Sequence, residues 1–266
     1  MKFLFSDIAV LARMRALLVV LTKRELSARF AGSIGGIVWA WIQPALTIAS
    51  YFVVFDLVFA MRLGEQAPSE RVGTFLIVGM IGWMAFSEMT QRGMSSLVDV
   101  GGLLQKNPLP PVLFPARSVL ASAVVFFPLF LLVTVAYWPM HHGALAISAM
   151  LPLLALQTVT AWLLGYLLAI LMAALRDVAQ LVAFVFSVGV FAAPILFPLT
   201  MFPERWRWVL WLNPITPYVL GYQNVLLKGQ WPPASIWLAI GITIAVIAVI
   251  LNIVIGRSRD QLVDWL

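Results

Sequence analysis

The side chains best suited to chemistry in this sequence are a few charged residues set in apolar surroundings. Glu88 follows the uncharged run Val72–Ser87 and precedes Arg92 by four residues, the spacing at which opposite charges meet on a helix. Asp56 follows another uncharged run, Phe30–Phe55. A charge inside a membrane costs about 2.5–3.5 kcal/mol, so it usually faces a polar interior or a partner. The spacing therefore predicts a Glu88–Arg92 pair that is either purely structural or lines a polar lumen, and an Asp56 that either has a functional role or simply reaches water.

The sequence contains no recognisable set of residues for hydrolysis or group transfer. It has no Ser-His-Asp set, no H-E-x-x-H motif and no carboxylate dyad. His141 and His142 are adjacent but lack a third ligand nearby, so we expect no metal site. The chain has no cysteine, which excludes disulfide, thiolate and Fe–S chemistry. It also lacks any Gly-Lys dipeptide and hence the G-x-x-x-x-G-K-[ST] nucleotide loop, so we expect no catalytic residue and no cofactor in this chain.

Long uncharged stretches separate these polar residues. Residues 118–175 contain no Asp, Glu, Lys or Arg, and one bilayer crossing takes roughly 20 apolar residues, so this stretch can cross twice. Hydrophobic residues make up 62% of the chain and charged residues 11%, whereas soluble domains average about 45–50% and 25%. The pattern predicts an all-α integral membrane protein, in one domain over 33–256. Its six transmembrane helices are expected at about 33–60, 73–97, 112–138, 144–174, 178–199 and 234–256.

The distribution of positive charge predicts the orientation of these spans. Segments 1–32, 92–117, 175–177 and 257–266 hold twelve of the 17 basic residues, and the alternate segments hold five. Cytoplasmic loops carry the excess of Lys and Arg, so both termini, including the tail 257–266, are expected in the cytoplasm of a multi-pass bacterial inner-membrane protein. The net charge of +6 is explained in the same way, by this rule and by anionic membrane lipids, and does not indicate nucleic acid.

Two segments do not fit simple spans. Apolar residues recur at helical spacing through Ile8–Ala28, with Arg13, Arg15, Lys23 and Arg24 off the stripe. Because of these four internal charges, 1–32 is expected to contain an amphipathic helix in the cytoplasmic interface; the alternative is a seventh span. The outer segment 200–233 is rich in Trp and Pro and is broken by Asn213-Pro214 and Pro217. Such a segment predicts short re-entrant or interfacial helices before the last span.

Several motifs occur in an order that resembles a known family. The chain resembles the membrane subunit of type-2 ABC exporters, in the polysaccharide branch that exports O-antigen, capsule or teichoic acid. The resemblance covers nearly the whole chain. It rests on TKRELSARFAGSIGGIVWAWIQP at 22–44, FSEMTQRGMSSL at 86–97, LQKNPLPPVLFPAR at 104–117, LRDVAQL at 175–181 and FPLTMFPERWRWVLWLNPITPYVLG at 197–221.

The resemblance implies partners and roles, and it makes the short re-entrant helices of 200–233 gate helices at the exit. Two copies of this chain would form a homodimeric pathway, driven by two copies of a separate cytosolic ABC ATPase that binds ATP and Mg. ATPase coupling maps to the cytosolic segment before the first span and to the loop between spans four and five. The residues concerned are Lys23, Arg24, Glu25, Arg29, Phe30, Arg176 and Asp177. From the residues alone, the first group could equally be interfacial anchors and Arg176-Asp177 a solvated turn.

The same resemblance suggests how a lipid-linked polymer would be held. Sugar rings have apolar C–H faces, so an aromatic wall offers weak contacts along which a chain can move, as ions move between multiple weak sites. Trp39, Tyr51 and Phe55 are the expected lumen positions, although ordinary helix packing also explains most aromatics of the spans. Arg13, Arg15 and Lys23 are expected to attract the lipid pyrophosphate at the cytoplasmic leaflet.

The predicted function is therefore a membrane permease subunit that exports a lipid-linked polysaccharide, without being an enzyme itself. An ABC-2 exporter of a drug or simple lipid is the alternative within transport. A membrane-embedded glycosyl- or acyltransferase would need an acid/base set that the sequence does not contain. A scaffold for a polymerase would not depend on an ATPase.

Overall fold

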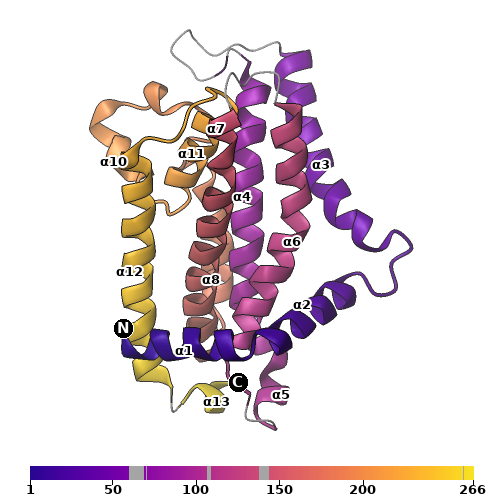
Figure 1. The fold of residues 1–266 in the computed structure, drawn as a ribbon, viewed down its shortest axis with the longest axis vertical. Coiled ribbons are helices and arrows are strands. Elements are labelled where there is room, and N and C mark those ends of the chain that lie inside the picture. Colours follow the sequence, from indigo (N-terminus) through magenta and orange to yellow (C-terminus); the bar gives the residue numbers. More distant parts are fainter. Residues whose placement is uncertain (60–68, 70, 107–108, 138–143, 260) are drawn as a thin grey trace.

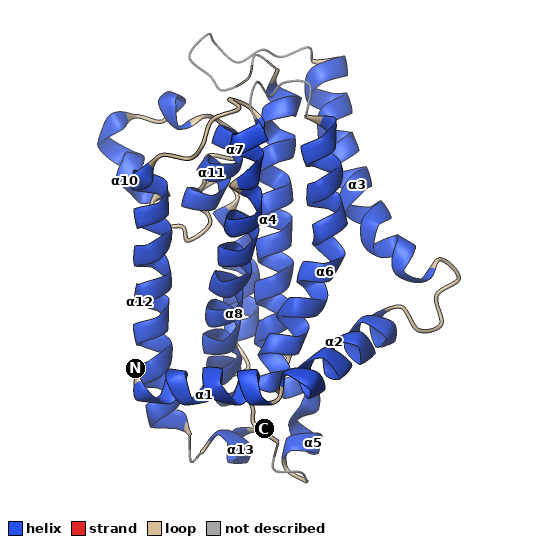
Figure 2. Ribbon diagram, in the orientation of Figure 1, coloured by secondary structure: helices blue, strands red, loops and turns tan. Residues whose placement is uncertain are grey.

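All regular elements in the described part of the chain are helices (Figure 2). The structure, a computed structural model, describes residues 1–59, 69, 71–106, 109–137, 144–259 and 261–266. The longer helices are α1 (Lys2–Arg13), α2 (Arg15–Arg29), α3 (Trp39–Phe52), α4 (Val72–Ser95), α6 (Leu113–Ala136), α8 (Met150–Ala174), α9 (Val178–Gly189), α11 (Thr216–Leu226) and α12 (Ala234–Ser258). The short α-helices are α5 (Gly101–Leu104), α7 (Ala144–Ser148), α10 (Arg207–Leu210) and α13 (Leu262–Trp265).

Five helical stretches among these residues are long and apolar enough to cross a membrane, judged by length and composition. They are Gly36–Val58, Val72–Ser95, Leu113–Ala136, Leu145–Ala174 and Ala234–Ser258. The chain is therefore an all-helical, multi-pass membrane protein, and each of these stretches matches one of the expected spans.

The sixth expected span, over 178–199, differs in the structure. Its helix α9 ends at Gly189 after 12 residues, and turns follow as far as Pro198. At about 1.5 Å per residue, α9 covers roughly 18 Å of a hydrocarbon core about 30 Å thick. Pro194 and Pro198 have no N–H to donate, which disfavours helix in this stretch. A count of six full spans is therefore not confirmed.

Helix α4 is the centre of the bundle (Figure 1). It packs against α8, α6, α11 and α3. In its most apolar window 78% of residues are buried, whereas the window of Gly36–Val58 is 6% buried. One core cluster joins α4, α6, α8 and α11, and a second joins α8 and α12 to α1 and the segment before α6. The first span is therefore peripheral, and many of its apolar side chains are exposed.

The C-terminal part of the first span is held to α4 by Asp56. The span passes from α3 into a π-helical segment, Val53–Val58, which contains this acid. The Asp56 carboxylate accepts a hydrogen bond from the Gly73 N–H at 2.7 Å, in the first turn of α4. An acid at this point satisfies a free N–H group and complements the helix dipole. Asp56 thus has a structural role as a cap supplied by the neighbouring helix.

The amphipathic helix expected over Ile8–Ala28 is two helices that meet at Met14. Helix α1 lies crosswise to α8 and α12, at the end of the bundle where both chain termini lie (Figure 1). Asn252 of α12 accepts hydrogen bonds from the backbone N–H groups of Phe3 and Leu4 at 3.1 and 3.2 Å. The crosswise direction suits a helix in the membrane plane, and the interfacial location itself stays a prediction.

The outer segment forms α10 and α11, toward the end of the bundle opposite the termini (Figure 1). Helix α11 begins with Pro217 in its first turn, a position where the missing N–H costs nothing. Most of α11 is buried, and its Tyr218 and Tyr222 are among the largest fully buried side chains. The expected short helices before the last span are therefore present, with α11 inserted into the bundle core.

Candidate functional site

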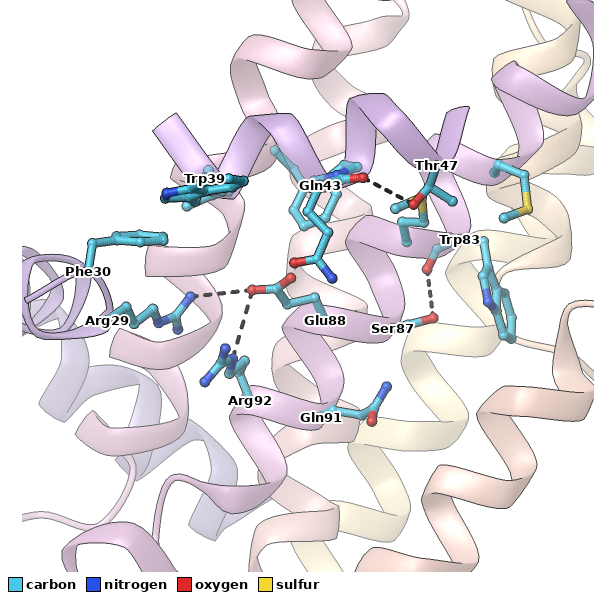
Figure 3. A pocket seen from close by; sticks show the side chains of 16 residues that line it. Arg29, Phe30, Trp39, Gln43, Thr47, Trp83, Ser87, Glu88, Gln91 and Arg92 are labelled. Carbon is cyan, nitrogen blue, oxygen red and sulfur yellow. Dashed lines mark hydrogen bonds and ion pairs between the residues drawn. The ribbon is translucent and has the colours of Figure 1, made fainter. Parts of the chain in front are cut away.

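A cavity of about 650 Å³ lies between the end of α2 and helices α3, α4 and α6. Its lining combines aromatic rings with charged and amide side chains. The lining includes Arg29, Phe30, Trp39, Gln43, Trp83, Glu88 and Arg92. Figure 3 shows Trp39 and Gln43 on α3 across the cavity from Glu88 and Arg92 on α4. Trp39 is 54% exposed and the Arg92 side chain 53%, so the cavity opens at the surface of the chain.

The charged residues that line the cavity come from two helices, α2 and α4. Glu88 Oε1 lies 3.8 Å from Arg92 Nε and 3.6 Å from Arg29 Nη1, at the end of α2 (Figure 3). The predicted Glu88–Arg92 pair therefore forms, and Arg29 joins it. Both distances exceed the 2.7–2.9 Å typical of a charge-assisted hydrogen bond, so Glu88 is held loosely. Two arginines facing one carboxylate leave the cavity wall with an excess of positive charge.

Behind this wall, Glu25 is the centre of a tighter polar network. Its carboxylate accepts hydrogen bonds from Arg29 Nη2 and Ser118 Oγ, both at 2.8 Å. Arg117 Nε lies 2.9 Å from Glu25 Oε2 as an ion pair that lacks hydrogen-bond alignment. Arg29 also donates to Ser122 Oγ at 2.9 Å and to the Ser118 carbonyl at 3.0 Å. The side chains of Arg29, Glu25 and Arg117 are only 9%, 14% and 18% exposed, so the network joins α2 firmly to α6.

The structure divides the expected ATPase-coupling residues into two groups. Lys23 and Arg24 are exposed on α2, and Arg176 and Asp177 are exposed between α8 and α9. Glu25 and Arg29 instead face α6 and α4, while Phe30 lines the cavity. This difference arises because positions 25 and 29 share the α2 face that packs on α6. The coupling role of all these residues stays a prediction.

The expected lumen aromatics are also divided. Trp39 lines the cavity, whereas Tyr51 and Phe55 lie farther along the first span, with ring centroids 6.3 Å apart. Trp83 and Phe30 complete the aromatic part of the lining. Trp83 is not among the expected lumen positions, because nothing local in the sequence distinguishes a lining ring from a packing ring.

No sequence pattern indicates that residues of α6 are partners of the charged cluster. Arg117 immediately precedes the uncharged run that begins at Ser118, and a charge at a span boundary usually indicates only a membrane anchor. Arg117 comes close to Glu25 only because α2 packs against α6 in the folded chain.

The cations expected to meet a lipid pyrophosphate lie elsewhere. Arg13, Arg15 and Lys23 are exposed on α1 and α2 and do not line the cavity. His141 and His142 lie outside the described residues. In α1, burial raises the pKa of Asp7 above its ordinary value, against the lowering effects of the Tyr166 hydroxyl at 3.0 Å and the Arg259 charge.

Chemically, this site suits reversible binding of a polar ligand. Rings can contact apolar faces of a ligand, while guanidinium and amide groups hydrogen-bond its oxygens. The cavity holds one carboxylate between two cations and no visible pairing of a nucleophile with a base.

Comparison with known proteins agrees with this architecture. A family model described as ABC-2 type transporter matches residues 16–227. The O-antigen export system permease protein RfbA of Myxococcus xanthus is 30% identical over 258 residues, covering 94% of this chain and 95% of the relative. A protein of the same name from Klebsiella pneumoniae is 24% identical over 216 residues, covering 80% and 81%. The polysialic acid transport protein KpsM of Escherichia coli is 20% identical over 210 residues, covering 77% and 79%. The chain therefore belongs to the ABC-2 type transporter family.

Proposed function

We propose that this chain is the permease subunit of an ABC exporter that moves a lipid-linked polysaccharide of the O-antigen or capsule type across the inner membrane. The observation that carries the proposal is the similarity along 94% of the chain to an O-antigen export permease. A relative that aligns from end to end shares the whole membrane architecture, not a single motif. The exporter is driven by a separate ATPase that binds ATP and Mg, because this chain lacks the nucleotide loop.

The cavity is the proposed place where the polymer passes. Trp39, Phe30 and Trp83 supply ring surfaces for the sugars, and Gln43 and Arg92 supply hydrogen-bond donors. Each contact is weak, which a moving polymer requires, since a tightly held sugar would stop the chain. Tyr51 and Phe55 are proposed to extend this aromatic track along the first span.

The track is completed by a second copy of this chain. The first span, α9 and the turn after α9 expose large apolar side chains, among them Leu57, Phe184 and Phe191. A homodimer that joins these faces would enclose the open side of the cavity, and membrane lipids would cover the apolar faces that remain exposed.

Coupling to the ATPase is proposed at two exposed charged segments. Lys23 and Arg24 on α2, and Arg176 and Asp177 before α9, are available to a cytosolic partner if the termini face the cytoplasm. Glu25 and Arg29 would then transmit the movement of α2 to α6 and α4 through the buried network. Arg13, Arg15 and Lys23 would attract the pyrophosphate of the lipid anchor at the membrane surface.

Deletion of the gene tests this function. Gel analysis should show loss of one surface glycan together with accumulation of the same lipid-linked polymer inside the cell. An unchanged surface would favour export of a drug or simple lipid. Loss of the glycan without internal accumulation would favour a glycosyl- or acyltransferase or an assembly scaffold.

A further inference from the structure

The break after α9 is unusual because its backbone is buried without being helical. Ala193, Pro194 and Ile195 are buried, and Ile195 packs against Gly79 of α4. Buried carbonyl groups require hydrogen-bond partners, and in lipid no water replaces a lost helical bond. The partners of these carbonyls therefore reveal what holds the break in place.

Two side-chain amides from 200–233 donate to three carbonyls of the break, those of Gly189, Ala192 and Pro194. Asn213 Nδ2 donates to the carbonyls of Gly189 and Ala192 at 2.9 and 3.2 Å, while its Oδ1 accepts from the Ile215 N–H at 3.3 Å. Gln223 Nε2 donates to the Pro194 carbonyl at 2.7 Å, and Gln223 is only 2% exposed. We call Asn213 and Gln223 the amide clamp.

The clamp rests on a fixed support. Tyr222 of α11 donates to Gln157 Oε1 of α8, and Gln157 Nε2 donates to the Gly82 carbonyl of α4 at 3.1 Å. Tyr218 of α11 lies 2.5 Å from the Thr160 hydroxyl of α8. Helix α11 is therefore tied by buried polar bonds to the central helices of the bundle, and the end of α9 is tied to α11.

The rest of α9 is held much less firmly. Val182 is its one buried residue, and Phe186 also packs inward, with its ring 5.6 Å from that of Trp83 and 6.1 Å from that of Phe86. At the break, a Cβ on Gly189 would come within 2.6 Å of Trp83 Cη2, so the backbone lies directly against this ring. Trp83 also lines the cavity. Helix α9 thus combines a fixed outer end, a contact with the cavity wall and an exposed charged loop at its start.

We propose that Asn213 and Gln223 are positioning residues that make the outer end of α9 a fixed pivot beside the cavity. The helix would tilt about Gly189 when the exposed loop at Arg176 and Asp177 moves, and this tilt would shift Phe186 against Trp83. The amide clamp would keep the motion from displacing α11, so that the outer helices stay in place while the cavity wall changes. The pivot is inferred from the structure alone; only its role in moving a transported molecule rests on the proposed function.

Hydrogen exchange of the complex in nanodiscs, compared without nucleotide and with ATP trapped, tests the pivot directly. Exchange within 189–198 should be the same in both states, whereas exchange within 178–188 should change severalfold. Equal changes in the two segments would overturn the proposal. This readout needs no glycan substrate, so it stays interpretable if the gene deletion shows that the transported molecule is something else.

Variants of the clamp supply the second test. Asn213→Leu and Gln223→Met should each increase exchange in 189–198 at least tenfold and lower glycan export per ATP hydrolysed at least tenfold, with ATPase activity retained. Asn224→Leu is the matched control, because Asn224 donates only to Leu220 of its own helix and should leave export per ATP unchanged. Clamp variants that behave like this control would overturn the proposal. If one variant fails to fold, the nucleotide comparison in the unmodified protein still decides it.

Discussion

Replacement of Glu25 by Gln should destabilise the protein, because Glu25 neutralises two arginines at the junction of α2 and α6. Two hydrogen bonds end on its carboxylate, and Arg117 contributes an ion pair at 2.9 Å. Hydrogen bonds to charged groups contribute about 1.5–3 kcal/mol each, and breaking a buried pair costs about 3–5 kcal/mol. Gln retains one acceptor, and Arg29 keeps Ser122 and Glu88, so we expect a net loss of about 2–3 kcal/mol. At about 2–4 °C per kcal/mol for a chain of this size, Tm should fall by roughly 5–10 °C.

The measurement is thermal unfolding of the purified protein in one detergent, with Arg24→Gln as the control. Arg24 is exposed on the same helix, so its removal should change Tm by less than about 1 °C, as is usual for exposed charges. If Glu25→Gln unfolds at the same temperature as the control, the network contributes no stability and the reasoning is refuted. Arg24→Gln is expected instead to weaken the ATPase contact, so the two variants separate structural from docking roles.

A double-mutant cycle sharpens this test. Glu25→Gln and Arg117→Gln should be less destabilising together than the sum of the single changes, by about 1–2 kcal/mol, because each removes the same ion pair. Additivity within about 0.5 kcal/mol would mean that the 2.9 Å contact carries no interaction energy.

Three other predictions concern the cavity, the break after α9 and the N-terminal helix. Trp39→Ala should reduce the amount of surface glycan severalfold without lowering Tm, since the ring is half-exposed. Trp39→Phe should retain most of the surface glycan, because a ring remains in place. Equal loss of glycan in both variants would exclude a ring contact. Gly189→Ala should lower stability by about 1–3 kcal/mol, because the added methyl group would collide with Trp83. The measurement is Tm, and an unchanged Tm would show that the end of α9 shifts freely away from Trp83. Asp7→Asn should raise Tm at pH 7.5. A folded-state pKa above the unfolded value means that stability is lost as pH rises through the folded-state pKa, because the half-buried carboxylate must ionise. The advantage of Asn should shrink as the pH is lowered toward that pKa, and a pH-independent difference would indicate lost packing instead.

Membrane character and helix positions are readable from the sequence because they depend on local composition. Each span requires a continuous apolar stretch, and charges are excluded from that stretch wherever it lies in the bundle. Five expected spans accordingly match helices of membrane length. The exception, α9, has the same apolar composition, but its backbone after Gly189 finds amide partners in the outer segment and does not need to remain helical.

The site was only partly predictable. The Glu88–Arg92 pair follows from a spacing within one helix, and it forms. The partnership of Glu25 with Arg117 and Ser118 joins residues more than 90 positions apart, and no local pattern connects them. The choice of Trp39 and Trp83 as lining rings likewise depends on how α3 and α4 face each other.

The sequence by itself determined that this chain is a membrane protein, lacks the nucleotide-binding loop and resembles a polysaccharide export permease. The tertiary structure decided which charges face a cavity, which are buried between helices and which remain exposed to a partner. The physical reason is that hydrophobicity acts on each residue separately, whereas hydrogen bonds and ion pairs depend on the relative positions of two groups. Those positions are set only when the helices pack together.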